Sequence, residues 1–335
     1  MTRGKIDHLI DKELLDTPIY KLGLENLDMP FPAQIERLFS TLSKRGLNID
    51  LKIWPSDEWF SPEGKAGIAI PFTLMHPRLI ALEKKILGFC EGSTPKEFYK
   101  LLVHECGHAI DHAFKLKEDA RRDKVFGDSN KKYPRYYIPK PYSKNYVKHL
   151  PNSYAQSHPD EDFAETFSIW MRPKAQWKKQ YKGWAALEKL KYMDEILSEC
   201  RGVEQKQRMH NTLLNATRDT RTLREYFAWK KKDFNVNGNR YFKHRLQMKA
   251  FEKTKSYEIV KPTLKAIEKD ICHSISKRLK IKKYLVKSML KEIEKEMKIK
   301  KLRLKEDQLS KSEIEKLIYE SSNDFIQTKS HRIKM

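Results

Sequence analysis

The sequence predicts an α+β fold followed by an all-helical extension. Two short segments near residues 50 and 70 have strand patterns, amphipathic helix patterns surround them, and from about residue 187 the pattern is almost wholly helical and rich in Lys. The 335 residues suffice for two domains. We therefore expect a mixed domain over 1–235, with a small sheet and a long central helix, and a Lys-rich helical extension over 236–335.

The first half of the mixed domain contains one helix and two strands. A helix is expected over 32–46, where apolar side chains recur at helical spacing and Gly46 ends the pattern. A strand is expected over 47–54, where Leu and Ile alternate with polar residues, and another over 67–72, GIAIPF. The second strand is interpreted either as an ordinary buried strand or as a sheet edge that pairs with an extended peptide.

The long helix is expected from Thr94 to about Leu116. Thr94 suits the N-cap, Pro95 suits the first helical position, and Glu97 can close a capping box. Its middle carries LLVHECGHAIDH, residues 101–112. A Pro- and Tyr-rich segment over 131–159 follows, and its length suggests a binding role. A second helix, DEDFAETFSIWM, begins near Pro159 and ends before Pro173.

These two helices carry a candidate zinc site. His104 and His108 share one helix face, so they can present two imidazole nitrogens to one metal ion while Glu105 faces the same cleft. Zinc in a catalytic site needs a third protein ligand, commonly a carboxylate, and Glu161 is the candidate. Glu165, one turn later, can accept the free ring N–H of a ligand histidine. The alternative is a histidine pair without metal. The cap of the first helix and the pair Glu161 and Glu165 on the second helix favour zinc.

The stretches HECGHAID and SYAQSHPDEDFAETF resemble a bacterial family of zinc-binding metallopeptidases of the gluzincin type. They resemble more distantly the catalytic domain of anthrax lethal factor. The similarity covers roughly residues 20–235. It implies a zincin-like domain with Zn²⁺, in which Glu161 is the third ligand, Glu165 is the closing glutamate and Tyr154 assists catalysis.

The expected activity is hydrolysis of peptide bonds. Glu105 would act as general base on a water molecule and then protonate the leaving amine. Tyr154 would donate a hydrogen bond to the developing oxyanion, a role worth on the order of 3 kcal/mol. Asp111, one turn past His108, either orients a ligand histidine or is a surface or hinge acid. His158 is interpreted as a helix cap.

The basic charge belongs mainly to the C-terminal part. The chain holds 68 Lys and Arg and 45 Asp and Glu, which give a net charge of +23. Residues 201–335 hold 36 of the basic residues and 17 of the acidic ones. This part could bind nucleic acid or an acidic partner through its cations and neighbouring aromatic residues, Tyr226, Phe227, Trp229, Tyr241 and Phe242. The alternative is a solvated helical face. A binding scaffold with a structural or inactive zinc site is therefore the second functional hypothesis.

The basic charge, the cysteines and the apolar segments also indicate the kind of substrate and the cellular compartment. A basic surface would attract acidic peptides, and the resemblance implies glutamate-rich ones, since we associate relatives with ATP-grasp amino-acid ligases. The four cysteines lie far apart without a CxxC pair, which argues against a disulfide framework and for a reducing compartment. We find neither a secretory signal nor a segment of roughly 20 apolar residues, so we expect a cytoplasmic protein without membrane contact.

Overall fold

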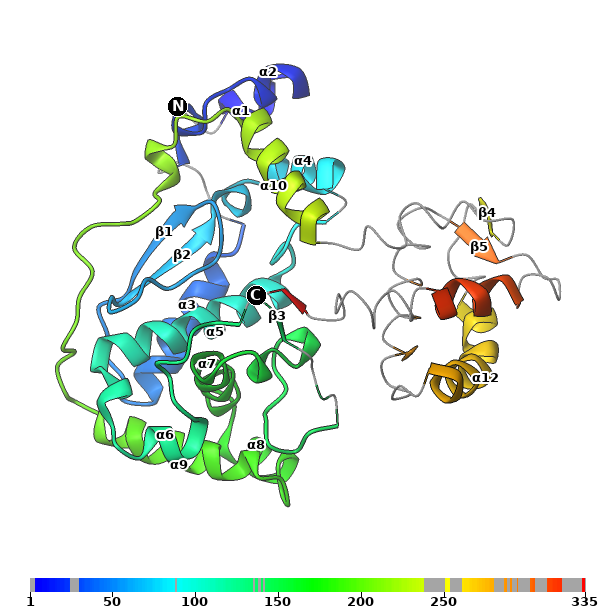
Figure 1. Cartoon of the computed structure of the whole chain (residues 1–335). Coiled ribbons are helices and arrows are strands. Elements are labelled where there is room, and N and C mark those ends of the chain that lie inside the picture. Colours follow the sequence, from blue (N-terminus) through cyan, green and yellow to red (C-terminus); the bar gives the residue numbers. More distant parts are fainter. Residues whose placement is uncertain are drawn as a thin grey trace. The chain divides into compact units, whose positions relative to one another are not determined.

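The computed structural model divides the chain into two compact units, Met1–Lys230 together with Met335, and Lys231–Lys334 (Figure 1). In the first unit it describes residues 4–24, 30–87, 89–134, 136–137, 140 and 142–230. In the second it describes 231–237, 251–253, 261–279, 286–287, 290, 294, 302–304, 312–320 and 333–334. The first unit is a mixed, mainly helical structure with a small parallel sheet, which is compatible with the predicted α+β class.

The small sheet pairs β1 (Lys52–Ser56) with β2 (Gly67–Pro71) in parallel. The first strand begins later than predicted, because the Asp50 N–H donates to the side-chain oxygen of Gln205 at 2.5 Å instead of to a strand. Strand β2 is buried along its whole length, and the Ala69 N–H donates to the Phe60 carbonyl at 2.8 Å. These contacts favour the interpretation of β2 as a buried strand.

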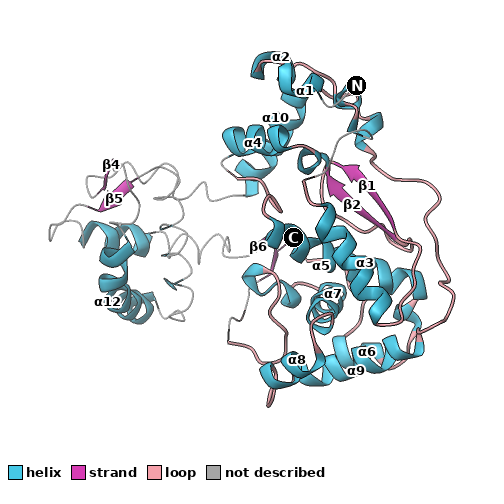
Figure 2. Cartoon of the chain, turned by 180° about the vertical axis from the view of Figure 1, so that it is seen from behind, coloured by secondary structure: helices cyan, strands magenta, loops and turns pink. Residues whose placement is uncertain are grey.

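The helices surround this sheet, with β2 on one side of α5 (Pro95–Phe114) and α7 (Pro159–Trp170) on the other (Figures 1 and 2). The other α-helices of the first unit are α1 (Gly4–His8), α2 (Asp11–Leu15), α3 (Pro32–Lys44), α4 (Pro77–Leu87), α6 (Arg122–Phe126), α8 (Lys174–Gln180), α9 (Ala186–Glu199) and α10 (Leu223–Asn237), which continues into the second unit. Short 3₁₀ helices are η1 (Ile19–Leu22), η3 (Phe72–Met75), η4 (Leu116–Glu118), η5 (Pro151–Gln156) and η6 (Ala216–Arg218), and β3 is Tyr136–Tyr137. No helix in the described parts of the chain is both long and apolar enough to cross a membrane.

The predicted caps of the two central helices are confirmed. The Thr94 hydroxyl accepts the Glu97 N–H at 3.3 Å at the start of α5. At the start of α7 the ring nitrogen Nδ1 of His158 accepts the Asp160 N–H at 3.2 Å. The four cysteines are buried free thiols.

Helices α5 and α7 approach each other closely at Gly107. A Cβ atom placed on Gly107 would lie 2.8 Å from the Ala164 Cα and 3.1 Å from the Ala164 carbonyl oxygen. Backbone atoms cannot move aside as the end of a flexible side chain can. Gly107 therefore lets the helix that carries His104 and His108 pack directly on the helix that carries Glu161.

Gly107→Ala is expected to lower the free energy of unfolding by about 1–3 kcal/mol, the usual cost of overpacking a core. The same change should weaken metal binding at the site predicted between His104, His108 and Glu161, because it pushes α7 away from α5. Thermal denaturation and metal titration measure the two effects, with Lys84→Ala, at an exposed position of α4, as the control. Unchanged stability in Gly107→Ala would contradict the close approach.

The second unit contains α12 (Lys261–Leu279), β4 (Phe251–Lys253), β5 (Leu302–Leu304) and β6 (Ile333–Lys334). The prediction of an all-helical extension is wrong, because β4 pairs antiparallel with β5. Leu302 and Leu304 flank Arg303, so this segment has the period of two that a strand requires. Residues 312–320 form a further helix, and the buried core of the unit includes Ile271, Ile275, Leu317 and Ile318.

The aromatic residues proposed to stack on nucleic acid bases do not form one exposed set. Tyr226 and Phe227 are buried in the core of the first unit, whereas Trp229 is exposed. Tyr241 and Phe242 lie outside the described residues. The stacking interpretation is therefore wrong for Tyr226 and Phe227.

Candidate metal centre

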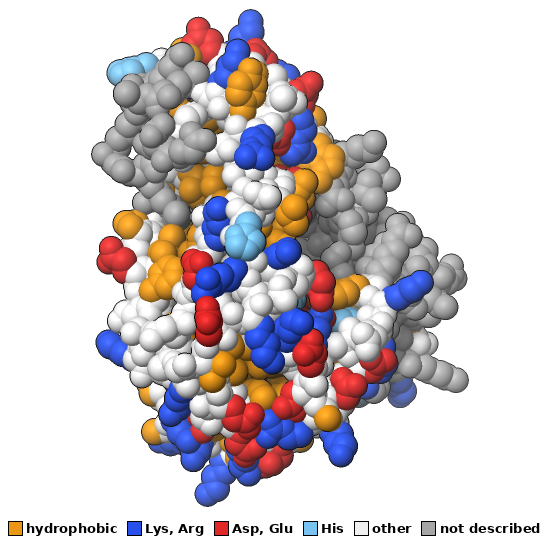
Figure 3. Space-filling view, turned by 90° about the vertical axis from the view of Figure 1, so that its left-hand side faces the viewer, with side chains coloured by type: hydrophobic (Ala, Val, Ile, Leu, Met, Phe, Trp, Pro, Cys, Tyr) orange, Lys and Arg blue, Asp and Glu red, His pale blue; other side chains and the backbone are white. Residues whose placement is uncertain are grey.

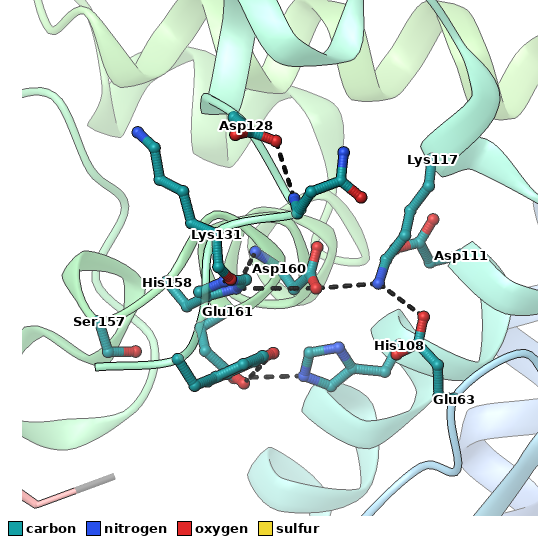
Figure 4. A network of polar contacts seen from close by, with 12 residues as sticks. Glu63, His108, Asp111, Lys117, Asp128, Lys131, Ser157, His158, Asp160 and Glu161 are labelled. Carbon is teal, nitrogen blue, oxygen red and sulfur yellow. Dashed lines mark hydrogen bonds and ion pairs between the residues drawn. The ribbon is translucent and has the colours of Figure 1, made fainter. Parts of the chain in front are cut away.

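Three predicted ligands converge between α5 and α7. The ligand atoms of His104, His108 and Glu161 all lie within 4.8 Å of one another. Oxygen Oε2 of Glu161 lies 3.0 Å from Nε2 of His104 and 3.2 Å from Nε2 of His108. Figure 4 shows the carboxylate and the His108 ring pointing toward each other. All three side chains are largely shielded from solvent, so a group of this composition could hold a metal ion.

Glu165 fixes the orientation of His104 from behind. It is fully buried, and its Oε1 lies 3.2 Å from Nδ1 of His104. Its Oε2 accepts the Leu150 N–H at 2.9 Å and the His149 N–H at 3.3 Å. Since both backbone groups are obligate donors, Glu165 acts as an acceptor, and Nδ1 of His104 carries the proton. Nε2 then presents its lone pair toward Glu161, which is the state required of a metal ligand.

The contact between His104 and Glu161 requires positive charge. With its proton on Nδ1, His104 offers Glu161 a lone pair, and two acceptors 3.0 Å apart repel each other unless a cation or a second proton lies between them. Burial alone would lower the pKa of His104, but hydrogen bonding to the carboxylates of Glu161 and Glu165 raises it well above its usual value. Burial likewise favours protonation of Glu161, yet the two histidines hold its pKa well below the usual range. The cluster consists of two imidazoles and one carboxylate, and a further carboxylate contacts one of the imidazoles from behind. This set of groups suits zinc.

Glu105 lies beside this cluster on α5 with 7% of its surface exposed. Burial raises the pKa of Glu105, and the neighbouring His104 and His108 only partly oppose that rise. A glutamate whose pKa is raised in this way takes up a proton more readily than an exposed one. The structure thus brings Glu105 and the three candidate ligands together.

Two tyrosines border the cluster. The Tyr154 ring in η5 lies 5.5 Å from the His104 ring, and burial together with Glu161 and Glu105 raises the pKa of Tyr154, so its hydroxyl remains a donor. Tyr133, which the sequence motifs did not identify, donates its hydroxyl to Oε1 of Glu161 at 3.1 Å and stacks on His158 at 3.8 Å. Its only sequence signal was its place in the Tyr-rich loop.

Asp111 contacts neither ligand histidine. Its side chain is buried and lies 2.5 Å from Nη1 of Arg122, whose Nη2 donates to Asp160 at 3.1 Å. The predictions that Asp111 orients a ligand histidine or is a surface acid are therefore wrong, and a hinge role for Asp111 stays a prediction. The reason is that a guanidinium from α6 is a stronger partner for a carboxylate than a neutral imidazole.

The Arg122 pair belongs to a wider charge network beside the metal cluster. Lys117 lies 2.9 Å from Asp160 and 2.9 Å from Glu63 on the opposite loop (Figure 4). His112 lies 3.6 Å from the same Glu63, so its described contact is with the loop and not with the metal cluster. The network connects α5, α6, α7 and the loop before β2.

Asp111→Asn is expected to lower the free energy of unfolding by about 1–3 kcal/mol, because fully buried Arg122 loses one of its two charged partners. Zinc affinity should change by less than about twofold, since Asp111 does not touch a ligand. Chemical denaturation and zinc titration on the same sample separate the two effects. A large loss of zinc affinity at unchanged stability would restore the original interpretation of Asp111.

The match with known proteins is confined to the segment that carries this cluster. No curated protein and no solved structure matches the chain. The expected span of similarity, residues 20–235, is therefore supported only over a narrower range, and the distant likeness to lethal factor stays a prediction. Residues 97–181, from the first turn of α5 to the end of α8, match the model of a family described as "Putative zinc-binding metallo-peptidase".

Proposed function

We propose that this protein is a zinc-dependent metallopeptidase that hydrolyses peptide bonds. The observation that carries the proposal is the convergence of two imidazole nitrogens and one carboxylate oxygen within 4.8 Å, with Glu105 on the same helix. In this proposal His104, His108 and Glu161 hold Zn²⁺. The match of residues 97–181 to a family described as zinc-binding metallo-peptidases supports it.

Each residue around the cluster has a separate task. Zinc bound by such ligands lowers the pKa of a water molecule and polarises a carbonyl group. Glu105 takes the proton of the attacking water and delivers it to the leaving amine. Tyr154 donates a hydrogen bond to the oxyanion that develops on the substrate. Glu165 keeps the Nε2 lone pair of His104 available, and Tyr133 holds Oε1 of Glu161 so that Oε2 faces the histidines.

The number of ligands distinguishes this function from a binding scaffold with structural zinc. Structural zinc sites are usually closed by four protein ligands, whereas catalytic sites keep one position open. Among the described residues the candidate group has three members, and His112, the next histidine on α5, contacts Glu63. The substrate is proposed to be a peptide or protein, with acidic or glutamate-rich sequences as the predicted preference.

The identification of new protein termini in cells tests the proposal. Cells that express the wild-type protein are compared with cells that express Glu105→Gln, and both proteins are checked for equal abundance and zinc content. We expect a set of new N-termini that depends on Glu105. An identical set of termini in both cultures would contradict peptidase activity.

A further inference from the structure

A groove of about 1480 Å³ is lined by residues of α3, the start of α5, the end of α7 and α8, and Glu105 is not among them. Figure 2 shows these helices from behind. Lys96, Lys100 and Val103 recur at positions i, i+4 and i+7, so one stripe of α5 forms its wall, and Glu105 lies on another face. Val103 and His149 are buried in its floor.

The groove concentrates positive charge without compensation. Eight Lys and Arg line it, and none of its described lining residues is Asp or Glu. Lys174 forms an ion pair with Asp194, but no described carboxylate lies within ion-pair distance of the other seven cations. This differs from the face in Figure 3, where basic and acidic side chains are intermixed. It also differs from residues 1–200 as a whole, which hold 32 basic and 28 acidic residues.

Several of these cations also have contacts within the protein. Arg45 donates to the Arg172 carbonyl at 2.5 Å and lies over the Trp170 ring, and Lys100 donates to the His149 carbonyl at 2.9 Å. Burial lowers the pKa of Arg45, and the positive charge of Arg201 lowers it further against the opposing effect of Asp194. The charges of Arg45 and Arg201 thus repel each other, and an anion between them would relieve that repulsion.

We propose that this groove binds the phosphate chain of a small polyphosphorylated molecule. Four of the cations are arginines, whose guanidinium forks match phosphate oxygens in pairs. The volume exceeds that of a single phosphate ion and fits a chain of them. Inorganic triphosphate and a nucleoside triphosphate share this chemistry.

The lining argues against single-stranded nucleic acid as the occupant. Such strands bind through aromatic side chains on which successive bases stack. Tyr99 is the aromatic residue among the described lining, and the Arg37 guanidinium already covers its ring at 4.2 Å. The groove therefore offers cations for phosphates and no free platform for bases. An acidic peptide is the remaining competitor, and the test below includes it.

Lysine labelling of the full-length protein tests where the ligand binds. Lys44 and Lys96 line the groove and are exposed, whereas Lys65 and Lys182 are equally exposed outside it. Inorganic triphosphate is expected to protect Lys44 and Lys96 from acetylation and to leave Lys65 and Lys182 unchanged. Uniform protection of all four lysines would show diffuse electrostatic binding and overturn the proposal. Protection by a hepta-glutamate peptide but not by triphosphate would overturn it in favour of an acidic peptide.

Matched charge reversals give an independent measurement. The double variant Arg37→Glu with Arg201→Glu is expected to raise the Kd for triphosphate at least about tenfold. A change of this size corresponds to the loss of one or more charge-assisted hydrogen bonds. Lys65→Glu with Lys182→Glu changes the net charge equally and should alter Kd less than about twofold. Titrations with ATP show whether a nucleoside adds affinity to the shared phosphate chain. Equal effects of the two double variants on triphosphate binding would overturn the groove as the site.

Discussion

Glu105→Gln is expected to lower the rate of peptide hydrolysis by about 10²- to 10⁴-fold and to leave one zinc ion bound per chain. The amide of Gln occupies the same volume as the carboxylate but cannot accept a proton from water. Burial raises the pKa of Glu105, which favours its accepting a proton from water. The measurement is kcat on a peptide whose cleavage depends on the wild-type protein, together with zinc content by mass spectrometry.

The control for this experiment is Glu195→Gln. Glu195 is an exposed residue of α9, and its change should leave both kcat and zinc content as in the wild type. If Glu105→Gln retained full activity with zinc bound, the assignment of Glu105 as general base would be wrong. If it lost zinc as well as activity, Glu105 would act on the metal cluster and not on the proton.

The part of the site that could be predicted is the part that depends on local helical geometry. His104 and His108 are four residues apart within a capped helix, and Glu161 and Glu165 are four apart within another. Such spacing places side chains on one face whatever the rest of the fold does. The convergence of the two faces needed the resemblance as well, because no spacing rule states which helix packs on which.

Several errors came from partners on other elements of the fold. Asp111 contacts Arg122, which lies 11 residues further on in another helix, and Asp50 contacts Gln205, which is 155 residues away. Tyr133 reaches Glu161 from a loop without regular periodicity. The periodic spacing of apolar residues in a helix or a strand does not predict such contacts, because they depend on how the elements pack against one another. The same holds for Gly107, whose role becomes visible only against the backbone of Ala164.

Glu161→Ala is expected to abolish stoichiometric zinc binding at micromolar zinc. The change removes one of three ligands and leaves two imidazoles, for which zinc has far lower affinity. It also removes the acceptor of the Tyr133 hydroxyl. Glu195→Ala on α9 serves as the matched loss of an exposed carboxylate and should keep zinc bound. Retention of zinc by Glu161→Ala, measured by dialysis against a chelator of known affinity, would exclude Glu161 as a ligand.

Glu165→Gln separates the role of the carboxylate behind His104 from that of a ligand. Glu165 accepts from one ring N–H and two backbone N–H groups, whereas Gln must present its NH₂ group to one of these donors. The expected result is a 10- to 100-fold lower zinc affinity, an effect smaller than that of Glu161→Ala. This order of effects follows because His104 keeps its Nε2 ligand atom in Glu165→Gln but loses the bond that orients it. The reverse order would mean that Glu165, not Glu161, is the third ligand.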